Sequence, residues 1–214
     1  MKDEQTEEKG FFVFDAKLRP WIDPPLNRIG VTCARRGISA NAVTLAGLAL
    51  GLAAAATIAV QGPVWLALGA LLLGRFADGL DGAIARATQK TDLGGYLDIF
   101  CDFIFYGAVP LAFVLREPEA NGLAGAVLLF SFYINAASFL GFAVMAEKRG
   151  MQTTAQGQKS LYYAAGLLEG FETILFFVLI AAFPALFVPA ALGFAALCTV
   201  TAVARVMLAF AGRV

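Results

Sequence analysis

The stretch that decides the fold, residues 77–103, reads ADGLDGAIARATQKTDLGGYLDIFCDF and carries two pairs of aspartates between long apolar segments. Asp78 and Asp81 are three residues apart, and Asp98 and Asp102 are four apart, so each pair shares one face of a helix. The polar residues between the pairs predict a turn. An antiparallel arrangement of the two helices then brings all four carboxylates to one depth, roughly 10 Å from the turn at a rise of about 1.5 Å per residue.

The composition is that of a membrane protein. Of the 214 residues, 59% are hydrophobic and 15% are charged, whereas soluble domains contain about half apolar and about a quarter charged residues. This favours an all-α integral membrane protein, in which the bilayer replaces a large core. The chain has no histidine, which excludes Ser-His-Asp and Cys-His catalysis and histidine metal sites. Carboxylates remain as the candidate catalytic groups.

Six apolar segments are long enough to form transmembrane helices. Pro184 and Pro189 divide the last two, which otherwise form an uncharged run too long for one span. The stretch REPEANG (116–122) predicts a loop, as do residues 147–159. We therefore predict a six-helix transmembrane catalytic domain over residues 39–214. Its expected spans are 42–60, 63–86, 92–115, 122–146, 161–183 and 189–210.

Residues 11–38 predict a juxtamembrane amphipathic segment, with a short helix that lies on the membrane surface. Apolar residues recur there at helical spacing and the arginines fall largely elsewhere, which is typical of an interfacial amphipathic helix. We expect Asp23 to cap this helix, with two prolines in its first turn. Gly37 is expected to end it, and Ser39 or Asn41 to cap the next helix.

The distribution of lysine and arginine predicts the orientation of a multi-pass inner or cytoplasmic membrane protein. Basic residues gather in the N-terminal segment, the turn after the second span, the 148–159 loop and the C-terminus, whereas the opposite loops contain only Arg116. Both termini and the aspartate site are therefore expected to be cytoplasmic. Residues 1–10 are polar and acidic, which predicts a short disordered tail rather than a cleaved signal peptide.

The residues around the aspartates indicate the chemistry of the site. Ionised carboxylates at one depth of a membrane repel each other and lose hydration. Divalent cations offset both effects, and oxygen-only ligands select Mg²⁺, Mn²⁺ or Ca²⁺ over zinc. Gly82, Ala85 and Gly94 are small enough to let a flat ligand approach the helices. Arg86 adds a bidentate phosphate partner, so the residues predict metal-assisted phosphoryl transfer on a ligand reached from the cytosol.

The spacing of these residues resembles the signature of the CDP-alcohol phosphotransferase family. The motif reads Asp78-x-x-Asp81-Gly82-x-x-Ala85-Arg86, then seven residues, then Gly94-x-x-x-Asp98-x-x-x-Asp102. The resemblance implies phospholipid biosynthesis, with transfer of a phosphatidyl or other substituted phosphate group from a CDP-linked lipid to an acceptor alcohol. CDP-diacylglycerol is the expected donor, and CMP is the expected leaving group.

The resemblance also implies a role for each matched residue. One or two Mg²⁺ or Mn²⁺ ions would be held by Asp78, Asp81, Asp98 and Asp102. The CDP and phosphate groups would bind at Asp78, Asp81, Gly82, Ala85, Arg86 and Gly94. Asp102 would in addition be the general base that deprotonates the acceptor alcohol. A homodimer in contact with membrane lipids is implied as well, and no nucleic-acid partner is expected.

The acceptor stays open among glycerol phosphate, inositol or its phosphate, serine and other alcohols. The candidate acceptor-binding residues are Lys148, Arg149, Lys159, Glu169 and Glu172. The two glutamates, which form a same-face pair, alternatively partner Arg75 or Arg86. Asn135 and Ser138 are expected to hydrogen bond between helices.

A second class of protein also fits intramembrane carboxylates, namely a cation- or proton-coupled multi-pass transporter. The aspartates cluster at one end of the membrane and the sequence has no visible internal repeat, so the enzyme is favoured.

Overall fold

The computed structural model describes residues 14–148 and 170–210, and within these ranges it is entirely helical. The predicted polar tail, residues 1–10, lies outside the described residues. The elements are α1 (Phe14–Arg35), α2 (Ala40–Ala59), α3 (Val64–Ala87), α4 (Asp92–Arg116), α5 (Pro118–Lys148), α6 (Gly170–Ala182), the 3₁₀ turn η1 (Pro184–Leu186) and α7 (Phe187–Phe210).

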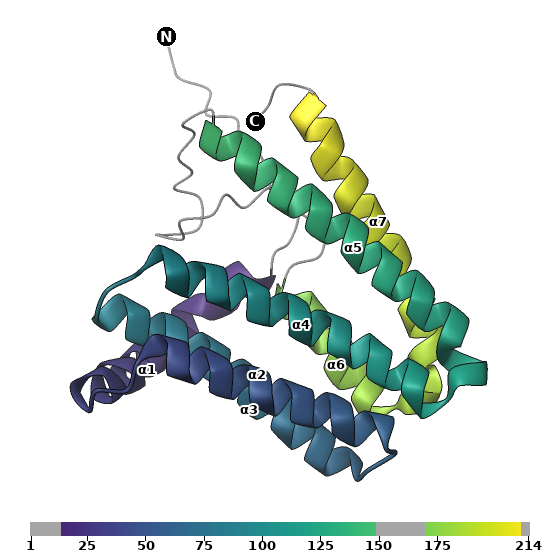
Figure 1. The fold of residues 1–214 in the computed structure, drawn as a ribbon, viewed down its shortest axis with the longest axis horizontal. Coiled ribbons are helices and arrows are strands. Elements are labelled where there is room, and N and C mark those ends of the chain that lie inside the picture. The colour runs from purple at the N-terminus through teal and green to yellow at the C-terminus, as the bar shows by residue number, and fades with distance from the viewer. Residues whose placement is uncertain (1–13, 149–169, 211–214) are drawn as a thin grey trace.

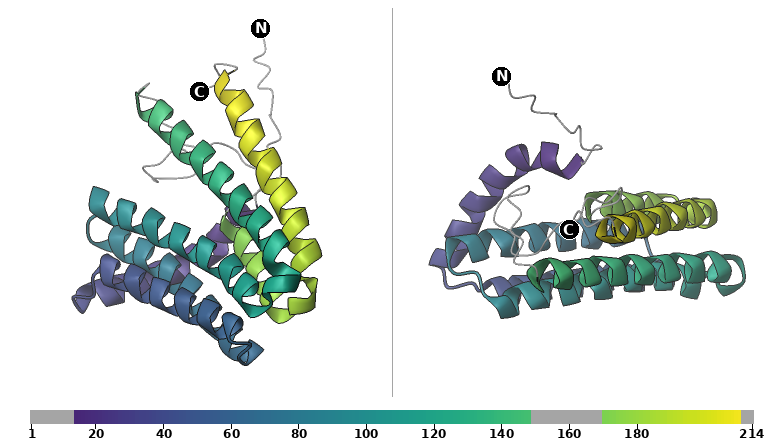
Figure 2. Two further views of the ribbon diagram at one scale, coloured as in Figure 1. Left: turned by 45° about the vertical axis from the view of Figure 1, so that its right-hand side comes forward. Right: turned by 90° about the horizontal axis from the view of Figure 1, so that it is seen from above.

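The helices form two groups that meet at one end and diverge at the other (Figure 1). In the first group α2 packs against both α3 and α4, and α1 lies against α3; in the second, α5 packs along α7. α4 and α5 are joined at Glu117 and separate along their lengths, as a second direction of view also shows (Figure 2). The aspartate-bearing end of α4 therefore lies where the two groups open.

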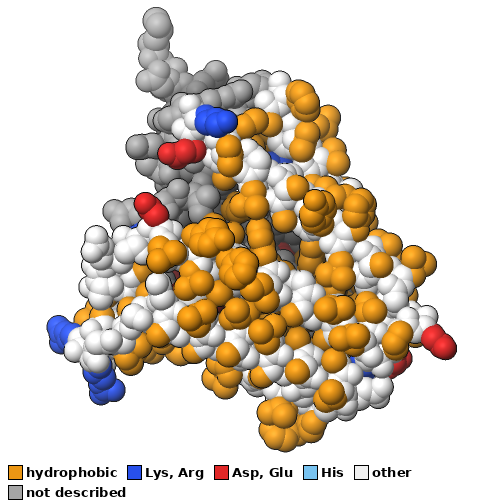
Figure 3. Space-filling view, viewed as in Figure 1, with side chains coloured by type: hydrophobic (Ala, Val, Ile, Leu, Met, Phe, Trp, Pro, Cys, Tyr) orange, Lys and Arg blue, Asp and Glu red, His pale blue; other side chains and the backbone are white. Residues whose placement is uncertain are grey.

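Among the described residues, four helices are long and apolar enough to cross a membrane: α2, α4, α5 and η1 with α7. α3 has a similar length, but from Arg75 onward it contains two aspartates and two arginines. α6 is apolar and has 13 residues, and residues 161–169 of the predicted span lie outside the described ranges. The face seen in Figure 3 is largely covered by apolar side chains, with charged groups at its margins. The count of six spans stays a prediction.

Small residues let α2 approach α3 and α4 closely. A Cβ added at Gly47 would lie 3.2 Å from the carbonyl oxygen of Gly74 in α3. One turn later, a Cβ at Gly51 would lie 2.6 Å from the ring of Phe105 in α4. Because α2 contacts both neighbours along one face, it sets the position of α3 relative to α4.

The helix predicted from Pro63 past Arg86 is confirmed as α3, and the one predicted to begin near Asp92 is confirmed as α4. The loop predicted over 116–122 is wrong, because α5 begins at Pro118. Proline is favoured in the first turn of a helix, and the polar residues that follow it lie at the helix end. Asn121 also donates a side-chain hydrogen bond to the carbonyl oxygen of Phe113 (2.8 Å), which links the start of α5 to α4.

The prediction that Asp23 caps a short helix is also wrong. α1 begins at Phe14 and continues through Asp23 and the two prolines after it. Proline removes a backbone donor and bends a helix, and α1 is visibly curved (Figure 2). The end of this helix is as predicted, because Gly37 has a φ of 78°. Ser39, and not Asn41, is the N-cap of α2, because its hydroxyl oxygen accepts a hydrogen bond from the backbone N–H of Ala42 (3.3 Å).

Candidate active site

Three of the four aspartates converge. One carboxylate oxygen from each of Asp78, Asp98 and Asp102 lies within 4.8 Å of the others. Asp78 comes from α3, and the other two come from the first turns of α4, where their four-residue spacing puts them on one face. All three are half-buried. Oxygen ligands at this separation fit a hard divalent cation, which would bind between the two helices.

Asp81 lies beside this group and has a different partner. It is buried, and its Oδ2 accepts a hydrogen bond from the hydroxyl of Thr44 in α2 (2.5 Å). The hydroxyl oxygen of Thr44 also lies 3.1 Å from the carbonyl oxygen of Ala40, which places this side chain against the first turn of α2. The expectation of a four-carboxylate group is thus refined to three carboxylates together and one held by α2. Sequence reasoning missed Thr44, which is 37 residues from Asp81.

The positively charged side chain of Arg75 lies beside the three carboxylates. Its Nη1 donates to Oδ1 of Asp102 (2.9 Å) and lies 3.6 Å from Oδ1 of Asp78. The guanidinium carbon of Arg75 also lies 4.4 Å from the ring centre of Phe105, which is the geometry of a cation–π contact. A half-buried cation here lowers the mutual repulsion of the carboxylates. The sequence pointed to Arg75 as a partner of glutamates in the fifth span, whereas its described ion pairs are with aspartates.

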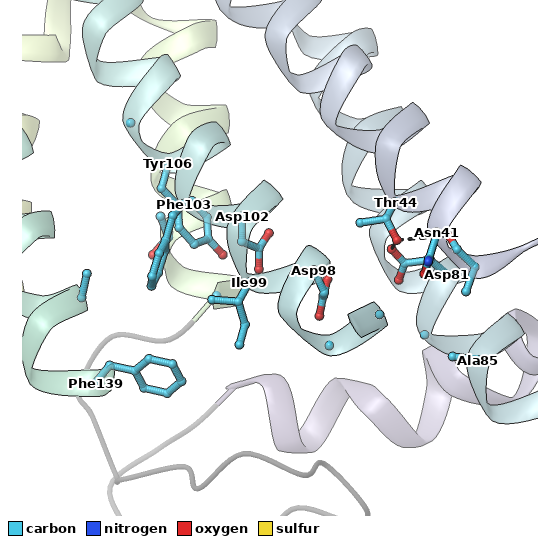
Figure 4. Close-up of a pocket in the computed structure, with 18 of the residues that line it drawn as sticks. Asn41, Thr44, Asp81, Ala85, Asp98, Ile99, Asp102, Phe103, Tyr106 and Phe139 are labelled. Atoms are coloured by element: carbon cyan, nitrogen blue, oxygen red, sulfur yellow. Dashed lines mark hydrogen bonds between the residues drawn. The ribbon is translucent and has the colours of Figure 1, made fainter. Parts of the chain in front are cut away.

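A cavity of about 650 Å³ opens beside the aspartates. Asp81, Asp98 and Asp102 line it, and Figure 4 shows Asp98 between the other two. Phe139 of α5 lies across the cavity from α4 (Figure 4). The size is within the range of sites for small molecules and cofactors, which is about 300–1,000 Å³.

The small residues predicted at a ligand site line this cavity. Gly82 and Ala85 of α3 and Gly94 of α4 all do so. At Gly94 an added Cβ would lie 3.0 Å from the Thr91 hydroxyl. Arg86 lines the cavity as well, and its guanidinium donates to Asn27 of α1.

The predicted acceptor residues are only partly described. Arg149, Lys159 and Glu169 lie outside the described residues. Lys148 is exposed at the last turn of α5, roughly 14 Å along the helix from Phe139. Glu172 is half-buried in the first turn of α6, next to Thr173, which lines the cavity.

A polar cluster that the sequence did not predict as a site lies on the opposite wall. Arg205 of α7 is buried, and its Nη1 donates to Oδ1 of Asn135 (3.0 Å) and to the hydroxyl of Ser138 (2.6 Å) in α5. The predicted interhelical bonding of Asn135 and Ser138 is confirmed. Arg205 and Asn135 both line the cavity. The signal available in the sequence was a lone arginine that ends a long uncharged run, since buried intramembrane charges are commonly functional.

The cavity therefore has two polar ends joined by apolar walls. One end presents carboxylates suited to a divalent cation, with Arg86 nearby; the other presents a buried arginine with amide and hydroxyl partners. Such an arrangement can bind an anionic ligand through a cation and orient a second polar molecule beside it.

Comparisons with known proteins agree with this geometry. The profile of the CDP-alcohol phosphatidyltransferase family matches residues 38–211. The inner membrane protein YnjF of Escherichia coli is 45% identical over 194 residues, which cover 91% of this chain and 94% of that protein. The archaetidylinositol phosphate synthase of Pyrococcus horikoshii is 41% identical over 88 residues, covering 41% of this chain and 46% of that protein.

Solved structures share the fold. The phosphatidylinositol phosphate synthase of Mycobacterium tuberculosis, crystallised with CDP-DAG bound, aligns with a TM-score of 0.58 at 24% identity, covering 85% of this chain and 88% of that chain. The same enzyme crystallised with manganese and citrate also aligns with a TM-score of 0.58 at 24% identity, covering 85% and 83%. At this identity the match establishes the helical arrangement.

Proposed function

Because the chain belongs to the CDP-alcohol phosphatidyltransferase family, we propose that it transfers a phosphatidyl group from CDP-diacylglycerol to a polar alcohol and releases CMP. Membership of this family identifies the chain as a transferase that takes part in phospholipid synthesis. The observation that carries the finer proposal is the convergence of Asp78, Asp98 and Asp102 beside a cavity that also contains Arg86. The solved relative with CDP-DAG bound supports the choice of donor.

A divalent cation, Mg²⁺ or Mn²⁺, fits the three converging carboxylates. Asp78, Asp98 and Asp102 would hold it, with Asp81 as a further ligand for a second ion. When bound, such a cation supplies charge stabilisation to the phosphoryl oxygens. The manganese in a structurally similar synthase supports this proposal.

Asp102 is the general base of the proposed reaction. Its carboxylate takes the proton of the acceptor hydroxyl, whose oxygen attacks the lipid-side phosphorus of the donor. The bond between that phosphorus and the CMP oxygen breaks, so that one phosphorus–oxygen bond forms and one is lost. Arg86 offsets part of the charge on the departing CMP. Arg75 holds Oδ1 of Asp102, which orients the carboxylate for proton transfer.

The acceptor is bound at the wall formed by α5, α6 and α7. A buried arginine, Arg205, with Asn135 beside it supports a polar and phosphate-bearing alcohol. Two of the similar proteins are named as inositol phosphate lipid synthases, so phosphorylated inositol is one acceptor to test. The further residues proposed for acceptor binding are Lys148, Arg149, Lys159, Glu169 and Glu172.

The protein is proposed to work in the inner membrane as a multi-pass homodimer, with both termini and the active site facing the cytoplasm. The name of the Escherichia coli relative and the four apolar helices support a location in the inner membrane. The basic residues predict the orientation. Family membership replaces the transporter as the explanation of the intramembrane aspartates.

The test of this function is CMP release from CDP-diacylglycerol by purified protein with Mg²⁺ or Mn²⁺. Acceptors would include glycerol 3-phosphate, inositol, inositol phosphate and serine. We expect release with one acceptor, and loss of release when EDTA removes the cation. A protein that neither releases CMP nor binds CDP-diacylglycerol in a cation-dependent way would contradict the proposal.

Replacing Arg86 by alanine is expected to weaken donor binding about tenfold or more, because a charge-assisted hydrogen bond to a phosphate is lost. The measurement is the Kd of a CDP-lipid with Mg²⁺ present. Arg36, which is exposed in the turn that follows α1 and does not line the cavity, provides a matched control as Arg36→Ala. Unchanged donor affinity in Arg86→Ala would remove this residue from the phosphate site.

A further inference from the structure

The exposed guanidinium of Arg86 is held by a residue from a different helix. Its Nη2 donates to Oδ1 of Asn27 at 2.8 Å, and its Nε donates to the same oxygen at 3.1 Å. Asn27 belongs to α1, 59 residues before Arg86 in the chain. An exposed arginine otherwise samples many rotamers. Two hydrogen bonds to one acceptor restrict these rotamers before the ligand binds, so the side chain loses less conformational entropy on binding.

The partner of Arg86 is an amide oxygen and therefore carries no charge. Arg75, which lies earlier in the same helix, is paired instead with the carboxylates of Asp102 and Asp78. A carboxylate partner would compete with a bound phosphate for the guanidinium, whereas an amide oxygen leaves the positive charge available. The chemistry of this contact suits an arginine that has to bind an anion.

α1 is seated against α3 so closely that the position of Asn27 is well defined. A Cβ added at Gly30 would lie 2.8 Å from the backbone carbon of Ala83 in α3. One turn earlier, Leu26 is buried, with its Cδ2 3.0 Å from the Cβ position of Gly79. Leu26, Asn27 and Gly30 share one face of α1. The same face that packs against α3 thus carries the amide that contacts Arg86.

From these contacts we propose that Asn27 is a positioning residue for donor binding: it holds the Arg86 guanidinium toward the cavity, uncompensated in charge, for the diphosphate of the CDP-lipid. The inference rests on the proposed function and deepens it. It makes α1 part of the donor site, although this helix precedes the segment that the family profile matches.

The test compares donor affinity and turnover in variants of Asn27 in the full-length protein. We expect Asn27→Ala to raise the KM and Kd for CDP-diacylglycerol by about 3–10-fold with kcat within about twofold of wild type, because a positioned hydrogen bond is lost but the reacting groups are not. Asn27→Asp keeps the shape and adds a charge that pairs with Arg86, so we expect a larger rise in Kd. Combined with Arg86→Ala, the Asn27→Ala change is expected to have no further effect on Kd.

Thr32→Ala is the matched control. Thr32 is an exposed polar residue of α1 whose hydroxyl donates within its own helix, to the carbonyl oxygen of Arg28. Donor affinity equal to wild type in both Asn27 variants would overturn the inference while the proposed function stands. An additive effect of Asn27→Ala on top of Arg86→Ala would also overturn it, because Asn27 would then act independently of Arg86. A wild-type protein that binds no CDP-lipid would overturn the proposed function and this inference together.

Discussion

Replacing Asp102 by asparagine is expected to abolish turnover while leaving the binding of CDP-diacylglycerol largely intact. Asparagine keeps the shape of the side chain, and it keeps an oxygen in reach of Nη1 of Arg75, which lies 2.9 Å from Oδ1 in the wild type. It cannot accept the proton of the acceptor alcohol. Since a positioned general base contributes about 10²–10⁴-fold, CMP release is expected to fall by at least that factor. The rate of CMP release and the Kd of the CDP-lipid, both with saturating Mg²⁺, measure the two effects.

The other carboxylates of the group are the matched comparison. Asp102 shares its charge with Arg75, whose Nη1 donates to its Oδ1, so it contributes less to holding the cation. Asp78→Asn and Asp98→Asn remove the other candidate cation ligands, so we expect both variants to weaken cation-dependent donor binding more than Asp102→Asn does, together with turnover. Equal losses of donor binding and turnover in Asp102→Asn would show that Asp102 acts chiefly as a cation ligand. Full turnover in Asp102→Asn would contradict both roles.

Much of the site could be predicted because the information is local. The spacing of Asp98 and Asp102 decides that they share a helix face, and the apolar runs on either side of the motif decide where α3 and α4 extend. Convergence of Asp78 with this pair follows once α3 and α4 are antiparallel. These relations hold within about 25 residues of sequence, where helical geometry controls direction.

The hydrogen-bond partners that sequence reasoning did not identify lie far from each other in the chain. The hydrogen bond from Thr44 to Asp81 spans 37 residues, and that from Arg205 to Asn135 spans 70. They depend on the rotation of each helix about its axis, which is set by packing such as that of Gly51 against Phe105. Hydropathy and spacing report which residues are apolar, but they do not report which neighbour each face meets.

The errors in element boundaries have a related cause. The polar residues at 116–122 predict a loop, although the ends of membrane-spanning helices are polar as well. α5 therefore begins at Pro118. Asp23 looked like a cap because prolines follow it, yet packing of α1 against α3 keeps the helix continuous there. Tertiary contacts prevailed over the local preference of these residues.

Arg75→Met is expected to lower the stability of the protein in EDTA by about 2 kcal/mol or more. Breaking a buried ion pair costs about 3–5 kcal/mol, and the partial exposure of Asp102 (27%) and Asp78 (35%) reduces that figure by solvent screening. Methionine keeps an apolar side chain beside Phe105. The loss of stability therefore comes mainly from the carboxylates of Asp78 and Asp102, which no longer have the Arg75 guanidinium as a partner. Thermal unfolding of the purified protein in detergent measures the change.

The same variant is expected to gain more from Mg²⁺ or Mn²⁺ than the wild type. A ligand that binds the folded state stabilises it by RT ln(1 + L/Kd), where L is the free ligand concentration, so tighter binding gives a larger stabilisation at the same ligand concentration. Without Arg75, a divalent cation no longer competes with that guanidinium for Asp78 and Asp102. The Tm of the variant should therefore rise more than that of the wild type over the same range of subsaturating cation concentrations. Arg86→Met, a change on the same helix but outside the carboxylate group, should respond to the cation as the wild type does. A Tm for Arg75→Met that follows cation concentration no more steeply than the wild type would mean that the three carboxylates do not bind the cation, because removing a competing positive charge must otherwise strengthen its binding.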